Sequence, residues 1–350
     1  MLTIYDAADG VLIKREGGAS ISPATVWIDL LNPTKDEDLQ VEQALAISVP
    51  TREEMSEIEA SSRLYQEGGG YFMTAIVLHQ PDMLHELPPL ATPVTFIISG
   101  HRLVTVRYAE PRAFPIFLAR AQKKDAACQS GIAVLVGLLE AIVDREADRV
   151  ERIQAQVDKL SQSIFGVKRG AEVEPPPRGV LDKLSQAIFG TKSGGRRRVL
   201  RFDVTIKMIG REGELTSRSR EGLLTLDRLT TYLAHVMSER GDEKALRARV
   251  KAASRDVQSL ADHIGYLSTK ITFLLDATLG MINNEQNSII KIFSVLAVAL
   301  MPPTLVGTIY GMNFKHIPEL EWLWGYPWAL ALMVLSAALP WLYFKRKGWL

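Results

Sequence analysis

The stretch Tyr310-Gly311-Met312-Asn313-Phe314 lies between two long apolar segments, residues 289–309 and 325–344. The first segment carries one formal charge, Lys291, and the second carries none. A helix needs ~20 predominantly apolar residues to span a bilayer, so each segment is long enough to cross a membrane once. We therefore predict a membrane hairpin with a short connecting loop, preceded by a long water-soluble region.

Basic residues beside the two spans predict their orientation. Lys345, Arg346 and Lys347 follow the second span directly. The loop between the spans contains Lys315 and two acidic residues. Under the positive-inside rule, both chain ends are cytosolic and the loop is external. We expect a multi-pass protein of the cytoplasmic (inner) membrane, with lipid around the two spans.

Composition argues against several classes of protein. The 350 residues have a formal net charge of +1 and include one cysteine, Cys128. A balanced charge does not favour nucleic acid as a partner, and one cysteine cannot form an intramolecular disulfide. The first residues, MLTIYDAADG, lack the pattern of a signal peptide. With no P-loop, HExxH or nucleophile–base pattern, we predict neither an enzyme nor an organic cofactor.

The N-terminal region alternates strand and helix signals. Strand-like runs occupy residues 26–30, 71–78, 93–98 and 103–108. Thr34 precedes Glu37 by three positions, which is the spacing of a capping box at a helix start. We predict an α+β cytosolic N-terminal domain, long stalk helices and a two-helix transmembrane C-terminus. The expected divisions are a cytosolic α/β domain (1–115), a helical region (116–241), a stalk helix (242–288), a first span (289–310), an external loop (311–324), a second span (325–344) and a basic tail (345–350).

A short duplication interrupts the helical region. Residues 158–166 read DKLSQSIFG and residues 182–190 read DKLSQAIFG. Two copies are too few for a solenoid. We interpret the repeat as a local duplication that lengthens the tip of a helical hairpin.

One helix is predicted from residue 242 to residue 309. The first proline in this stretch is Pro302, and apolar residues recur with three-four spacing. At ~1.5 Å per residue, the helix would be about 100 Å long. Because so long a helix cannot bury its apolar stripe alone, partner helices and an oligomeric stalk are expected.

The first span carries a stripe with polar or small residues at both ends and apolar residues in the middle. Packed around an axis, about five copies would line a pore with a polar mouth, a hydrophobic neck and a hydroxyl-lined outer section. Ordinary packing between membrane helices also favours small residues and Thr, so a simple helix–helix contact is the alternative interpretation of the stripe. The stripe consists of Asn287, Ile290, Phe293, Ala297, Met301, Thr304 and Thr308.

Neither span contains Asp, Glu, His or Cys. Ionisable residues within a membrane usually mark ion or proton paths, and a transporter that strips its ion needs such groups. The available ligands are backbone carbonyls and the side chains of Asn, Thr and Met. These suit a cation that keeps its water, and Mg²⁺ dehydrates reluctantly.

Gly311, Met312 and Asn313 end the first span. The free carbonyls at a helix C-terminus carry the negative end of the dipole. A ring of Asn313 amide oxygens beside these carbonyls would form an uncharged receptor for a hydrated cation. The alternative is a simple capping turn.

The C-terminal region resembles the CorA family of magnesium channels. The matching motifs are Met301-Pro302-x-Thr304, Tyr310 to Phe314, the Pro318-Glu319-Leu320 loop, Gly325-Tyr326-Pro327 and a basic end that closes in Trp349-Leu350; Asn284-x-x-Asn287 also fits. The resemblance implies a funnel-shaped homopentamer that admits Mg²⁺ passively and tolerates Co²⁺ and Ni²⁺. It also implies a selectivity filter at Gly311, Met312 and Asn313, a pore lined by Asn287, Met301 and Thr304, and closure by cytosolic Mg²⁺.

This sequence departs from the family pattern in two places and leaves the regulatory acids unmatched. Phe293 replaces an aliphatic gate residue and Thr308 a small residue, and a bulky ring could tighten a dewetting gate. Solvated surface carboxylates are the alternative reading for the candidate regulatory ligands, which are Asp82, Glu86, Asp256, Asp262 and Asp276.

The external loop contains Glu319 and Glu321, which could concentrate cations at the pore mouth. Two rival functions stay open. One is the zinc-transporting branch of the same superfamily, against which Met312 and the spans without titratable groups argue. The other is a membrane-anchored cytosolic sensor or scaffold without conduction, against which the stripe argues weakly.

Overall fold

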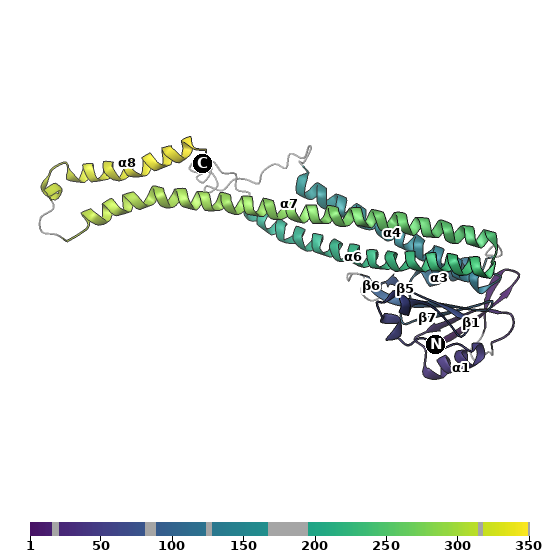
Figure 1. Ribbon diagram of the computed structural model, residues 1–350. Helices are drawn as coiled ribbons and strands as arrows, with labels where there is room; N and C mark the ends of the chain where they lie inside the picture. Colours follow the sequence, from purple (N-terminus) through teal and green to yellow (C-terminus); the bar gives the residue numbers. More distant parts are fainter. Residues whose placement is uncertain (16–20, 81–88, 124–127, 167–194, 314–317, 349–350) are drawn as a thin grey trace. The chain divides into compact units, whose positions relative to one another are not determined.

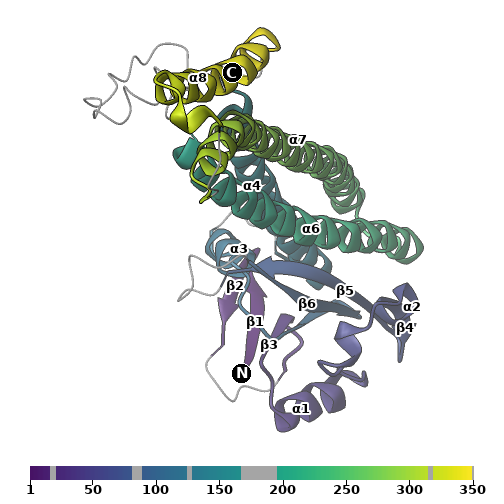
Figure 2. The same ribbon diagram turned by 90° about the vertical axis from the view of Figure 1, so that its left-hand side faces the viewer.

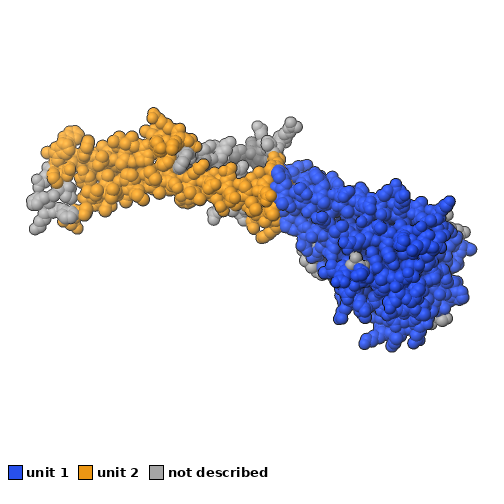
Figure 3. Space-filling view, viewed as in Figure 1, with its two compact units in different colours: residues 1–163, 208–273 blue, residues 164–207, 274–350 orange. Residues whose placement is uncertain are grey.

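The computed structural model describes the chain except residues 16–20, 81–88, 124–127, 167–194, 314–317 and 349–350. Figure 1 shows the order of the helices and strands along the chain. The chain divides into two compact units, which are coloured separately in Figure 3. Unit 1 contains Met1–Ser163 and Met208–Phe273, and unit 2 contains Ile164–Lys207 and Leu274–Leu350.

Unit 1 is built on a mixed sheet, whose seven strands in the described residues run in the order β2-β1-β3-β7-β6-β5-β4. Only β3 and β7 pair in parallel; every other neighbouring pair in this described sheet is antiparallel. The strands are β1 (Leu2–Ala8), β2 (Val11–Lys14), β3 (Thr25–Leu31), β4 (Leu64–Glu67), β5 (Gly70–His79), β6 (Leu90–Ser99) and β7 (Arg102–Arg107). The four strand-like runs of the sequence correspond to β3, β5, β6 and β7, whereas β1, β2 and β4 were not predicted.

The helices range from single turns to very long rods. The short ones are α1 (Lys35–Leu45), η1 (Glu54–Ser56), α2 (Ala60–Arg63), α3 (Ala113–Ala121) and η2 (Pro318–Glu321). The long ones are α4 (Gly131–Phe165), α6 (Gly195–Arg240), α7 (Lys244–Tyr310) and α8 (Gly325–Arg346). The single long helix predicted from the sequence is therefore confirmed as α7, which has 67 residues. The second copy of the repeated segment lies outside the described residues.

The predicted capping box starts α1. The Thr34 hydroxyl accepts a hydrogen bond from Glu37 N at 3.4 Å, and the Glu37 carboxylate accepts one from Thr34 N at 2.9 Å. The same carboxylate accepts a hydrogen bond from Leu2 N at 2.7 Å and lies 3.0 Å from the N-terminal ammonium. Burial opposes ionisation, but these hydrogen bonds and the ammonium lower the pKa of Glu37 to about 2. One carboxylate thus joins the start of α1 to β1.

The two faces of the sheet are covered differently, as Figure 2 shows. One face packs its β-branched and aliphatic residues, including Ile28 and Val104, against Val41 of α1. On the other face Trp27 is fully buried, stacks on Tyr5 and lies 6.4 Å from the ring of Phe114 in α3. Trp27 and Ile28 are neighbours along β3 and point to opposite faces of the sheet, as successive residues of a strand do. Each face of the sheet therefore packs against its own layer of the core.

A buried ion pair crosslinks the parallel strands β3 and β7. The Arg107 guanidinium donates to Asp29 through Nε at 3.0 Å and Nη2 at 2.7 Å. Thr105 Oγ1 donates to the same carboxylate at 2.7 Å and accepts from Trp27 Nε1 at 2.9 Å. The carboxylate and guanidinium are only 5% exposed, so these hydrogen bonds compensate for the removal of both charges from water.

Helices α4 and α7 run in parallel within unit 1. Arg249 of α7 forms a bidentate pair with Glu140 of α4, at 2.8 and 2.7 Å. Farther along both helices, Lys270 Nζ donates to Asp158 at 2.6 Å. The buried stripe of this part of α7 includes Val250, Val257, Ile264 and Leu267. The chain itself therefore supplies partner helices for the N-terminal part of α7.

Candidate functional site: the exposed stripe of α7 and the turn that follows it

Unit 2 contains the membrane-length parts of α7 and α8. Each helix includes an 18-residue window that is strongly apolar and only 6% buried within the chain. Leaving this much apolar surface in water would be unfavourable, and a bilayer accepts it. The apolar segments noted in the sequence, residues 289–309 and 325–344, lie within α7 and α8.

All seven residues of the predicted stripe are exposed on the single chain. Among them, Ile290 is 60%, Phe293 65% and Met301 70% exposed. Val295, on the opposite side of the helix from Phe293, is only 2% exposed. Within unit 2, α7 leaves this stripe uncovered together with Val298, Leu300 and Leu305, so the exposed surface is available to other copies of the helix and to lipid.

The threonine hydroxyls of the stripe are oriented by the helix backbone. Thr304 Oγ1 donates to the carbonyl of Leu300, and Thr308 Oγ1 donates to the carbonyl of Thr304, both at 2.8 Å. Each hydroxyl proton is used in the helix, so the oxygen lone pairs remain as acceptors on the exposed side. Water molecules around a cation point their hydrogens outward, and these oxygens can accept them.

The turn after α7 leaves little room for a side chain at position 311. Gly311 N donates to the carbonyl of Gly307 at 3.0 Å, and Met312 N donates to that of Ile309 at 3.2 Å. A Cβ at position 311 would lie 3.1 Å from the Gly307 oxygen, which is tighter than an ordinary contact. Met312 and Asn313 are exposed immediately after this turn, and Phe314 lies outside the described residues.

A second glycine fixes the segment between α7 and α8 against the start of α8. A Cβ on Gly325 would lie only 2.0 Å from the carbonyl oxygen of Glu319, so only glycine fits there. Gly325 N also donates to the carbonyl of Trp322 at 2.9 Å. The Glu319 side chain is partly exposed, while the side chain of Glu321 lies outside the described set.

The three candidate regulatory acids that the structure describes do not form a cluster in one chain. Asp82 and Glu86 fall outside the described residues. Asp256, Asp262 and Asp276 are exposed on α7, and the first and last are ~30 Å apart along a helix that rises 1.5 Å per residue. No group of three or more His, Cys, Asp or Glu side chains suited to a metal ion occurs among the described residues of a single chain.

The sequence matches the family described as CorA-like Mg²⁺ transporter protein over residues 22–346. The chain belongs to this family. The magnesium transport protein CorA of Salmonella typhimurium is 32% identical over 325 residues, which cover 93% of this chain and 92% of that protein. The resemblance inferred from the C-terminal motifs is therefore confirmed, and it extends through the N-terminal domain. The chain is a CorA-type Mg²⁺ transporter and not an enzyme.

Solved structures agree in fold. The complete CorA magnesium transporter of Methanocaldococcus jannaschii aligns with a TM-score of 0.72 at 17% identity, covering 100% of this chain and 99% of that one. The ZntB cytoplasmic domain of Vibrio parahaemolyticus aligns with a TM-score of 0.52 at 10% identity, covering 81% and 98%. Likeness at such identities concerns the fold alone, so it does not separate the magnesium from the zinc branch.

The family and the two apolar helices together establish the topology. The protein is an inner-membrane, two-span transporter with a cytosolic N-terminal domain, and Mg²⁺ is its transported substrate. It is a homo-oligomer, as CorA transporters are. This agrees with the exposure of the α7 stripe, which a single chain leaves uncovered.

Proposed function

We propose that this CorA-type transporter is a homopentameric, funnel-shaped channel for passive Mg²⁺ influx. Five copies of α7 would surround a pore lined by the stripe from Asn287 to Thr308. The observation that carries the proposal is the exposure of all seven stripe residues, with the two threonine acceptors facing outward. In this scheme residues 1–115 and 116–241 form the cytosolic body, 242–288 the stalk, 289–310 and 325–344 the spans, 311–324 the external loop and 345–350 a cytosolic tail.

The external filter in this proposal is the turn Gly311, Met312 and Asn313. The glycine lets the chain turn tightly at the end of α7 and leaves Asn313 exposed beside the last carbonyls of the helix. Five amide oxygens would bind the water shell of Mg²⁺ without removing it, which suits an ion that dehydrates reluctantly. Co²⁺ and Ni²⁺ hydrates would pass by the same contacts. Glu319 and Glu321 would raise the local cation concentration at the mouth.

The hydrophobic neck would act as the gate. Phe293 and Met301 are the most exposed apolar residues of the stripe, so in an oligomer they would narrow the pore and expel water from it. The rings at Phe293 would form the tighter constriction. A hydrated ion could pass only after the helices separate.

Intracellular Mg²⁺ would close the channel by binding between subunits. Three candidate ligands, Asp256, Asp262 and Asp276, are exposed on α7. Because one chain does not gather them, ions held between neighbouring copies would favour the closed arrangement of the stalk, which is a population shift between two states. Asp82 and Glu86 are further candidates.

Mg²⁺ entry into proteoliposomes, followed with a trapped Mg²⁺-sensitive dye, tests this function. We expect saturable, voltage-driven entry that is lost in Asn313→Ala. The matched control is Ser336→Ala, because that side chain lies on α8 and its hydroxyl donates to the carbonyl of Met333 within the same helix. Zn²⁺ entry that depends on a pH gradient, without Mg²⁺ entry, would move the chain to the zinc branch. Absence of flux for either ion would favour the scaffold.

A further inference from the structure

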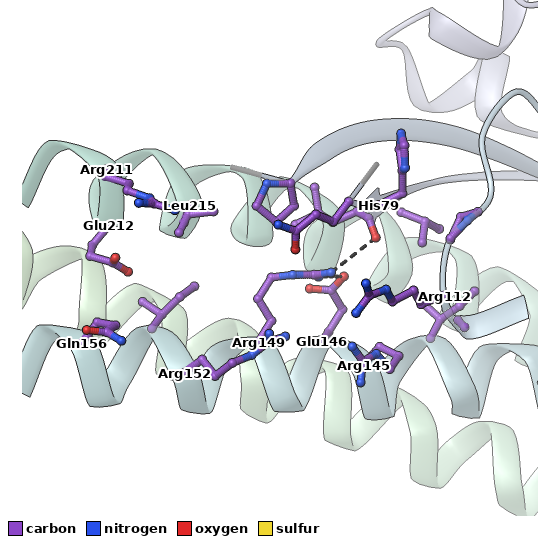
Figure 4. A pocket seen from close by; sticks show the side chains of 18 of the residues that line it. His79, Arg112, Arg145, Glu146, Arg149, Arg152, Gln156, Arg211, Glu212 and Leu215 are labelled. Atoms are coloured by element: carbon purple, nitrogen blue, oxygen red, sulfur yellow. Dashed lines mark hydrogen bonds and ion pairs between the residues drawn. The ribbon is translucent and has the colours of Figure 1, made fainter. Parts of the chain in front are cut away.

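Unit 1 contains a cavity of about 410 Å³, which Figure 4 shows from close by. Its walls come from the end of β5, the start of α3, and parts of the helices α4 and α6. The lining residues include His79 of β5, Ala113 of α3, Ile142 of α4 and Met208 of α6. Its size is within the ~300–1,000 Å³ of small-molecule pockets. The cavity is part of the cytosolic unit, apart from the exposed stripe of α7.

The lining is strongly basic. It includes five arginines, which are Arg112, Arg145, Arg149, Arg152 and Arg211. Two glutamates, Glu146 and Glu212, oppose them, so the described lining keeps an excess of three positive charges, although Arg145 also pairs with Asp148 outside the lining at 2.9 Å. Burial raises the pKa of Glu212. An excess of this size, within one cavity of a chain whose net charge is +1, favours an anionic ligand.

Three of the arginines share one face of α4. Arg145, Arg149 and Arg152 follow the four-three spacing that places side chains above one another on a helix. Burial and the neighbouring charges of Arg149, Arg145 and Arg112 lower the pKa of Arg152. The arginines are therefore close enough to repel one another, and a bound anion would relieve that repulsion.

Arg149 is held in place at the centre of the group. Its Nη1 pairs with Glu146 Oε1, and its Nη2 donates to the carbonyl of Leu78 at 3.3 Å, so it reaches from α4 to β5 (Figure 4). Glu146 is only 1% exposed. Its Oε2 atom and the Nε of Arg149 are buried without a hydrogen-bond partner in the described structure. Buried polar groups normally have partners, so the Arg149 Nε–H is a donor that an anionic ligand can use, whereas Glu146 Oε2 can only accept a hydrogen bond.

Another part of the wall is apolar, beside the uncharged polar residues His79, Gln80 and Gln156. Val77, Leu78, Ile142, Ile153, Met208 and Leu215 contribute to it. A simple inorganic ion would use only the arginines and would leave this surface against water. The ligand that satisfies both parts has an anionic head and an apolar or aromatic body.

We propose that this pocket binds a small organic phosphate of about the size of a nucleotide. The phosphate groups would lie on the arginines of α4 and on Arg112 or Arg211, and the organic part would lie on the apolar wall. Arginine suits this task because its planar guanidinium forms paired hydrogen bonds with phosphate oxygens. The site would make the cytosolic unit responsive to an organic phosphate, and the proposal does not depend on the ion-conduction scheme.

Titration calorimetry of the full-length, detergent-solubilised protein with ADP tests the proposal. The buffer is free of divalent metals, so binding is separated from transport. We expect saturable binding that Arg145→Gln/Arg152→Gln weakens by about tenfold or more, which is what the loss of charge-assisted hydrogen bonds predicts. Inorganic phosphate and adenosine should each bind more weakly than ADP.

Two further variants keep the test decisive. Arg120→Gln is the control, because Arg120 pairs with Asp144 at the surface and does not line the cavity. It should bind ADP like the parent. Gln156→Glu adds a negative charge at an exposed lining position and leaves the buried groups unchanged. It should also weaken the binding of ADP. Absence of saturable ADP binding, equal affinity for inorganic phosphate, or unchanged binding in both pocket variants would overturn the proposal.

Discussion

Phe293 and Val295 are two positions apart on α7, yet Phe293 is 65% exposed and Val295 only 2% exposed. The same helix thus has a covered side and an uncovered side within unit 2. In a membrane protein that is a homo-oligomer, the uncovered side is where other copies can pack or where a pore can form. The gate proposal depends on this difference.

Replacing Phe293 tests the hydrophobic neck. Phe293→Ala removes the largest side chain of the stripe and should increase Mg²⁺ flux, because a wider neck holds water more easily. Ile292→Ala is the matched control on the other side of the helix and should leave flux near the parental level. Proteoliposome flux at equal protein content measures both. If Phe293→Ala leaves flux unchanged or reduces it, Phe293 is not the gate.

Two glycine replacements should have opposite effects. Gly325→Ala would place a Cβ 2.0 Å from the Glu319 carbonyl, so the loop between the spans must shift. We expect lower thermal stability and strongly reduced Mg²⁺ entry. Gly265→Ala, with nothing within 4 Å of the new Cβ, should instead stabilise α7 by about 0.5–1 kcal/mol. Thermal unfolding in detergent checks both, and equal effects would contradict the steric reading.

Removing one partner of the Asp29–Arg107 pair should destabilise the fold more than removing both. Arg107→Met leaves Asp29 buried without its cation and should cost about 3–5 kcal/mol in the free energy of unfolding. Asp29→Asn/Arg107→Met removes both charges and should recover part of that loss. Denaturant unfolding of the single and double variants measures the coupling. Strictly additive costs would show that the two side chains do not depend on each other.

Glu37 should give unit 1 a pH-dependent stability. Its pKa is about 2 in the folded protein and lies near the ordinary value of about 4.3 in the unfolded chain. The stabilisation is therefore complete above pH ~5 and declines as the pH falls from about 4 towards 2. Glu37→Gln should cost roughly 1–2 kcal/mol at pH 7 and progressively less at pH 3. Thermal unfolding at both pH values checks this, and a cost that stays constant with pH would contradict it.

Much of the fold was predictable because its signals are local. Two apolar segments, the spacing of Thr34 and Glu37, and the long three-four pattern of α7 each depend on neighbouring residues only. Strand β1 was missed because its residues, LTIYDAA, become a strand through pairing with β3, which lies farther along the chain. Thr3, Ile4 and Tyr5 favour a strand, but the Asp6, Ala7 and Ala8 that follow do not, so the local signal is too short to be decisive.

The basic cavity was also missed, for a different physical reason. Arg145, Arg149 and Arg152 stand among acidic residues on α4, and such alternation usually marks a solvated helix face. Only the packing of β5, α3 and α6 around α4 turns that face into a cavity. The stripe of α7 could be listed from the sequence because its three-four spacing is visible there, whereas its full exposure required the structure.

The most direct test of the central claim is whether the stripe of α7 contacts the permeating ion. Cys128 is the only cysteine in the sequence, so Cys128→Ala provides a cysteine-free background. In that background Thr304→Cys places a thiol on the stripe, and Val306→Cys places one on the opposite side of the same turn. A positively charged thiol reagent should block Mg²⁺ flux through Thr304→Cys and leave Val306→Cys unaffected. Equal block of both, or block of Val306→Cys alone, would contradict a pore lined by this stripe.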